Sequence, residues 1–137
     1  MVRLLAFVLS ALTAAFTVST AMAHSYHTPN VCATNQAAAC AHLGFEGQPK
    51  ASANTTFMLH FMGPGFDASK LSNVSVKLWM ESMGHGSTPV TVAQKDPVHF
   101  EVSDAFFSME GAWQVKVAFT YGGAKHDIVI PVDVLAK

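Results

Sequence analysis

The sequence has little positive charge, and none of it is clustered. Arg3 is the only arginine, and the seven lysines are scattered singly along the chain. Proteins that bind nucleic acid or anionic lipid surfaces gather Lys and Arg on one face. The sequence therefore predicts neither a nucleic acid nor a lipid surface as a partner.

Motifs for hydrolysis and phosphate binding are also missing. The chain contains no G-x-S-x-G elbow, no glycine-rich phosphate loop and no H-E-x-x-H zinc pair. The nine carboxylates are dispersed, and no spacing among them suggests a pair of catalytic acids. We therefore expect that the protein is not an enzyme.

Long apolar runs are lacking after the N-terminus. Arg3 precedes an apolar stretch over residues 4–18, which ends in the small-x-small site Ala21-Met22-Ala23. About 15 apolar residues are fewer than the roughly 20 that a membrane-spanning helix needs. This pattern predicts a cleavable signal peptide over residues 1–23, no membrane span after cleavage, and a periplasmic or secreted location. The mature chain then has seven lysines against nine carboxylates, a net charge of about −2.

Cysteine is scarce as well, with only Cys32 and Cys40. An even number of cysteines in an exported protein indicates a disulfide. Closing so short a loop would stabilise the fold by about 2.5 kcal/mol in the chain-entropy model. A pair of thiolate metal ligands is the alternative, and an oxidising compartment favours the disulfide.

What the mature chain does contain is alternation of apolar and polar residues. Residues 24–53 lack it and are predicted to be an N-terminal extension held by the disulfide, with a helical turn across 36–42. Strands are predicted at 55–62, 74–80, 89–92, 98–102, 113–119 and 128–134. Short strands with turn signals between them predict an all-β fold for residues 54–137, an immunoglobulin-like antiparallel β-sandwich of six or seven strands.

Methionine and histidine are the chemically distinctive residues. Their tightest group is Met80, Met83 and His85, with His85 between two glycines that allow a tight turn. Soft thioethers together with imidazole favour copper, and Cu(I) in the sulfur-rich case, although zinc and silver would also accept such donors. Alternatively, Met80 continues the apolar phase of its strand as core filler, and His85 is an ordinary loop residue.

Two segments resemble a known family. Residues 78–90 resemble the M-x-x-M-G-H segment of YtkA-like and FixH-like domains. Residues 107–115, about 25 positions further on, resemble the F-x-M-x-G-x-W segment of the same group. The similarity covers roughly residues 55–135. It implies a small β-sandwich, exported or membrane-tethered, in a group with several members that handle copper or assist cytochrome oxidase assembly.

Carried over position by position, the resemblance implies a copper site of Met80, Met83, His85 and Met109. Met109 could instead pack on a neighbouring phenylalanine. The chain departs from the group in two ways. FixH-like members usually keep a membrane helix, and Glu81 stands where many relatives have proline, which loosens the turn.

The predicted function is therefore a periplasmic protein that buffers Cu(I) or delivers it to an envelope metalloprotein or an oxidase-assembly partner. One alternative is a non-metal module whose loops bind another envelope protein. A second is a Cu(II) oxidase-like protein that begins with His24, with His27 or His42 as a further donor. The strand face formed by Met58, His60 and Met62 is interpreted as a packed layer rather than a ligand set.

Overall fold

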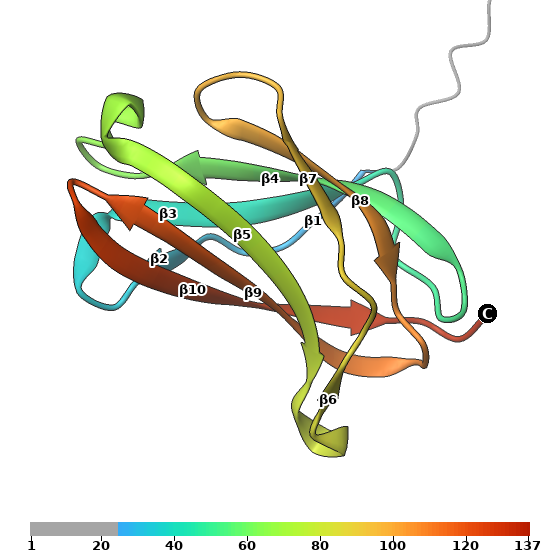
Figure 1. The fold of residues 1–137 in the computed structure, drawn as a ribbon. Coiled ribbons are helices and arrows are strands. Elements are labelled where there is room, and N and C mark those ends of the chain that lie inside the picture. Colours follow the sequence, from blue (N-terminus) through green and yellow to red (C-terminus); the bar gives the residue numbers. More distant parts are fainter. Residues whose placement is uncertain (1–24) are drawn as a thin grey trace, which may run out of the picture.

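The computed structural model describes residues 25–137, so the predicted signal peptide (1–23) and His24 lie outside the described part of the chain. Ten strands in this part form two antiparallel sheets, which confirms the predicted all-β sandwich (Figure 1). The strands are β1 (Tyr26–His27), β2 (Val31–Ala33), β3 (Gln36–Phe45), β4 (Asn54–Met62), β5 (Leu71–Met80), β6 (His85–Gly86), β7 (Thr91–Gln94), β8 (His99–Phe106), β9 (Gly111–Tyr121) and β10 (Ala124–Val134).

Between the strands lie two short 3₁₀ turns, η1 (Ala68–Lys70) and η2 (Glu81–Met83), and residues 25–137 contain no α-helix. Within that range no helix has the length and hydropathy of a membrane span. The larger sheet has the order β1-β3-β4-β8-β7, with β2 also paired to β3. The smaller sheet has the order β10-β9-β5-β6.

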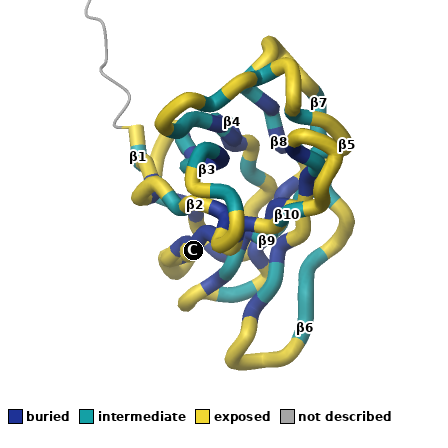
Figure 2. The backbone as a smooth tube through the Cα atoms, turned by 90° about the vertical axis from the view of Figure 1, so that its left-hand side faces the viewer, coloured by how far each residue is buried: buried dark blue, intermediate teal, exposed yellow. Residues whose placement is uncertain are grey.

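The core lies between the two sheets, as the dark segments in Figure 2 show. In β4 the side chains of Phe57, Leu59 and Phe61 are buried, while the residues between them are half-buried or exposed. Ile128 and Ile130 face the same core from β10. Burial of each such side chain contributes about 1.5–3 kcal/mol, so the predicted alternation has a direct energetic cause.

The N-terminal segment differs from its prediction. The helical turn expected across 36–42 is wrong, because β3 runs from Gln36 to Phe45 and pairs with β4 over six residue pairs. Ala39 and Ala41 bury small side chains and therefore give little periodic signal in the sequence. Residues 25–53 thus contribute three strands to the same sandwich as residues 54–137.

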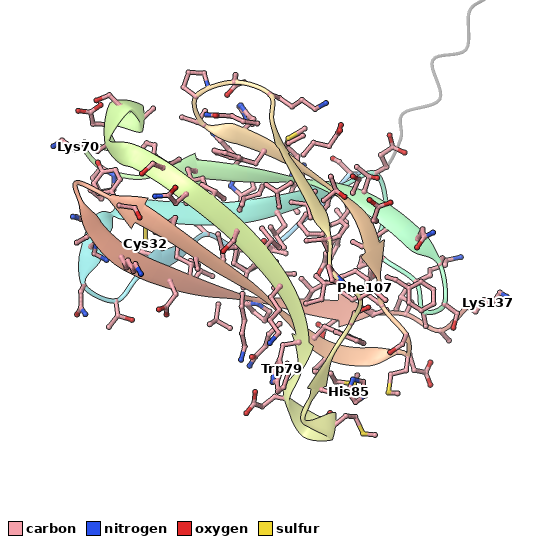
Figure 3. All side chains as sticks on the ribbon, in the orientation of Figure 1. Cys32, Lys70, Trp79, His85, Phe107 and Lys137 are labelled. Carbon is pink, nitrogen blue, oxygen red and sulfur yellow. A yellow bond between two sulfur atoms is a disulfide. The ribbon has the colours of Figure 1, made fainter. Side chains whose placement is uncertain are left out.

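The predicted disulfide is present between Cys32 and Cys40. The two residues lie directly opposite each other in β2 and β3, so the bond ties a three-residue edge strand to the sheet (Figure 3). Residues 25–137 contain no free cysteine. A structural disulfide is typical of proteins that fold in an oxidising compartment.

We predict that the double variant Cys32→Ala/Cys40→Ala loses about 2.5 kcal/mol of unfolding free energy, because the unfolded chain regains the entropy of the open loop. Urea denaturation of the mature protein measures the loss. Reduction of the wild-type protein should produce the same decrease and should not change the double variant. An unchanged unfolding midpoint in both experiments would show that β2 is held without the bond.

Candidate functional site

The first candidate site lies at the end of the sandwich marked by β6. β5 and β6 form a hairpin around η2, and their register places Met80 directly opposite His85. Gly84 adopts the left-handed conformation with φ 63°, and its N–H donates to the Glu81 carbonyl at 3.2 Å. A Cβ at Gly86 would lie 2.8 Å from the Leu78 carbonyl oxygen. The two glycines beside His85 therefore serve different needs, one conformational and one steric.

The side chain of Met80 points into the sandwich and is 3% exposed. Its methyl group lies 3.2 Å from the position that a Cβ at Gly111 would occupy. Gly111 is the first residue of β9, so Met80 joins the β5–β6 hairpin to the segment that precedes β9. This degree of burial is also what core filler would show.

Met109 lies in the segment just before β9. Its side chain is half-buried and packs against the core. The indole N–H of Trp113 donates to the Met109 carbonyl at 2.9 Å, and the Trp113 ring is 1% exposed, packed edge-to-face on Phe107. This bond fixes the backbone of Met109, which lies two residues before Gly111 in the chain.

His85 and Met83 form the outer part of the same end, where Figure 3 labels His85 close to Trp79. His85 is half-buried, with its ring centre 6.4 Å from that of Trp113. Its Nδ1 lies 3.1 Å from the Gly86 carbonyl oxygen. The tautomer protonated at Nδ1 donates this bond and leaves the Nε2 lone pair free for a ligand. Met83 is 56% exposed on the turn.

Side chains on the exposed side of the hairpin hold the turn η2 in place. The indole N–H of Trp79 donates to the Glu81 carboxylate at 2.8 Å. The ammonium groups of Lys77 and Lys116 lie 4.9 and 5.0 Å from the centre of the Trp79 ring. Glu81, which was expected to loosen the turn, is therefore tied to β5 by its own side chain.

The hairpin end thus receives its four predicted residues from β5, η2, β6 and the segment before β9. Residues 25–137 contain no group of three or more His, Cys, Asp or Glu side chains already assembled around a metal position. The four predicted residues at this end offer three thioethers and one imidazole.

A second cluster, which the sequence interpretation missed, lies on the outer face of the larger sheet. His60 in β4 pairs with His42 in β3 on one side and with His99 in β8 on the other. The His60 ring stacks on His99 with centres 4.2 Å apart, and meets the His42 ring edge-on at 5.0 Å. The ring of His27 follows, 5.9 Å from that of His42. We call these four residues the histidine row.

Polar groups fix both ends of the row. Asp96 accepts bonds from the backbone N–H groups of Val98 and His99, each at 2.9 Å, and its other oxygen lies 2.7 Å from Nδ1 of His99. At the opposite end, Thr28 and Leu43 exchange two hydrogen bonds that hold β1 against β3. The first contact orients the His99 ring, and the second holds the strand that carries His27 against β3.

The middle of the row is electrostatically unfavourable for positive charge. Burial lowers the pKa of His42 below its ordinary value of 6.5, and the nearby His27 and His99 lower it further. Burial likewise lowers the pKa of His60, as do His99 and His42, whereas Asp96 acts in the opposite direction. Nδ1 of His42 is buried without a hydrogen-bond partner. The central imidazoles are therefore held neutral near pH 7.

We predict that the metal-free protein loses stability as the pH falls below about 6.5. A lowered folded-state pKa means that the unfolded chain takes up protons on His42 and His60 first, which stabilises the unfolded state. The loss grows as the pH falls from 6.5 toward the folded-state values. Asp96 and Asp67 also have a lowered pKa, but they contribute only below about their ordinary 3.8.

Urea denaturation at pH 7 and pH 5 measures this difference. The double variant His42→Gln/His60→Gln should show a smaller decrease, whereas His126→Gln, a half-buried histidine of the other sheet, should keep the wild-type decrease. Lys95 and Glu101 form an ion pair at 3.0 Å on the same face. Equal pH dependence in the double variant and in the wild type would contradict the prediction.

Comparison with known proteins identifies the family of this chain. No curated protein and no solved structure matches this chain. The family model of YtkA-like domains matches residues 41–118. The match includes the β5–β6 hairpin, the segment that carries Met109, and the histidines of β3, β4 and β8. Because it covers more than half of the chain, this protein belongs to the YtkA-like family.

Proposed function

We propose that this protein binds copper as Cu(I) at the hairpin end of the sandwich, and buffers or delivers the metal outside the cytoplasm. The ligands are Met83, His85 and Met109, with Met80 as the inner thioether. Membership of the YtkA-like family and the Cys32–Cys40 disulfide support the setting. The residues at the hairpin end support the chemistry.

One observation carries the proposal. Met80 and His85 are a directly opposed pair, and the methyl group of Met80 lies 3.2 Å from the position of a Cβ at Gly111, the first residue of β9. Opposed residues have Cβ atoms about 4.5–5.5 Å apart, so a thioether and an imidazole begin close together. The hairpin therefore brings one thioether and one imidazole together, and Met109 precedes the strand that begins beside Met80.

The donor types select the metal. Thioether sulfur carries no proton at ordinary pH and is soft, so it favours Cu(I) over hard cations. The neutral imidazole of His85 adds a stronger donor through Nε2. The buried ring of Trp113 lies beside His85 and limits access of water from the core side.

Exposure of Met83 favours exchange of the metal with a partner. More than half of its surface is open to solvent, and weak thioether ligands are replaced easily. An envelope metalloprotein or an oxidase-assembly protein with its own soft donors could take the ion from this side. We propose transfer by stepwise ligand exchange, in which the exposed sulfur leaves first.

We predict that the mature wild-type protein takes up one equivalent of Cu(I), and that Met83→Ala/His85→Ala binds at least tenfold more weakly, because two donors are removed. Competition with a chromogenic Cu(I) chelator under anaerobic conditions measures the affinity. The matched control is Met58→Ala/His126→Ala, which removes one thioether and one imidazole away from the hairpin end. The control should compete like the wild type.

The single variant Met109→Leu separates the two roles considered for that residue. Leucine preserves the packing against the core but removes the sulfur. Weaker Cu(I) binding with unchanged thermal stability would support ligation. Unchanged affinity in Met83→Ala/His85→Ala would contradict the proposed site as a whole.

A further inference from the structure

We propose that the histidine row is a second metal site, independent of the hairpin end, which takes a borderline divalent cation of the Zn(II) or Cu(II) class through His42, His60 and His99. The site lies on the outer face of the larger sheet. Its donors are imidazoles without thioethers, so it differs from the first site in chemistry as well as in place.

The spacing of the rings suits a shared ion. A metal–nitrogen bond of about 2.1 Å places each imidazole centre about 3 Å from the metal, so two such centres lie about 5 Å apart at a tetrahedral angle. The His42 and His60 centres are 5.0 Å apart, and those of His60 and His99 are 4.2 Å apart. Strand register therefore brings each neighbouring pair of rings close to this separation. His42 and His99 flank His60 from opposite sides, so both outer rings must turn toward it to share an ion.

The rings are not yet turned toward a common point. His60 and His99 are nearly parallel, with an interplanar angle of 13°, so their in-plane lone pairs do not converge. This is consistent with the absence, within residues 25–137, of an assembled group of three such ligands. Binding requires rotation of side chains about their χ angles, which half-buried residues on an open sheet face can make without moving the backbone.

Asp96 places a carboxylate beside one ring nitrogen of His99, as is common at metal-binding histidines. Ligating imidazoles usually donate their second ring N–H to a carboxylate, which fixes the tautomer and raises the basicity of the ligating nitrogen. Nδ1 of His99 lies 2.7 Å from Asp96 Oδ2, and the tautomer that donates its Nδ1 proton to this carboxylate presents Nε2 as a free donor.

His42 supplies a second indication. Its Nδ1 is buried and has no hydrogen-bond partner. A buried polar atom without a partner is unfavourable, and rotation of the ring toward an ion would supply the partner.

The test is Zn(II) titration of the mature protein at pH 7 by calorimetry. One equivalent should bind to the wild type. His60→Gln, which removes the central ligand, should weaken binding at least tenfold. Asp96→Asn should weaken it by about tenfold, because the carboxylate that orients His99 is lost. His126→Gln, on the other sheet, should bind like the wild type.

The hairpin-end variant Met83→Ala/His85→Ala separates this proposal from the Cu(I) proposal. It should keep its Zn(II) affinity, whereas His60→Gln should keep its Cu(I) affinity. Imidazole ¹⁵N NMR of the wild type adds a readout that does not depend on any variant. Zn(II) should shift the ring nitrogens of His42, His60 and His99 and leave those of His85 and His126 in place.

Three results would overturn the histidine-row site. One is Zn(II) binding that is equally strong in folded His60→Gln and in the wild type. Another is a wild-type NMR titration in which the ring nitrogens of the row do not move. Loss of Zn(II) binding in Met83→Ala/His85→Ala would also overturn it, because the ion would then belong to the hairpin end.

Discussion

Strand register is the constraint on which the rest of this molecule depends. In β4 the side chains of Phe57, Leu59 and Phe61 fill the core, and a slip of one residue would turn them to solvent and bring His60 inside. Several kcal/mol of burial therefore hold the register. The same register sets His60 between His42 and His99, although none of these side chains belongs to the core.

The hairpin end depends on register in a similar way. Leu78 and Met80 are buried at the end of β5, and this fixes how the chain leaves the sheet. The short turn η2 then returns β6 to the partner position, with close contact at Gly86. The position of His85 follows from this pairing of β6 with β5. Its location is thus decided by the apolar residues of β5 and by two glycines.

The two candidate sites differ in what the fold does for each. At the hairpin end, a turn and the start of β9 bring soft donors to a rim that a partner protein could reach. On the histidine row, three paired strands align identical donors on an open face, and Asp96 orients the last of them. Thioethers suit Cu(I) and imidazoles suit divalent ions, so the two donor sets need not compete for the same metal.

Strands that alternate strongly, such as Phe57 to Phe61 and Ile128 to Val132, could be predicted from the residues alone, because burial follows their two-residue period directly. The disulfide could be predicted too, since its two cysteines are the only pair and lie close in the chain. Strand β3 was not predicted, because the small side chains of Ala39 and Ala41 give little hydrophobic signal. The strand is stabilised by its pairing with β4. That His42, His60 and His99 are neighbours became visible only in the folded structure. The pairing of strands distant in sequence is set by their shared core, so no local sequence pattern predicts which histidines will be adjacent.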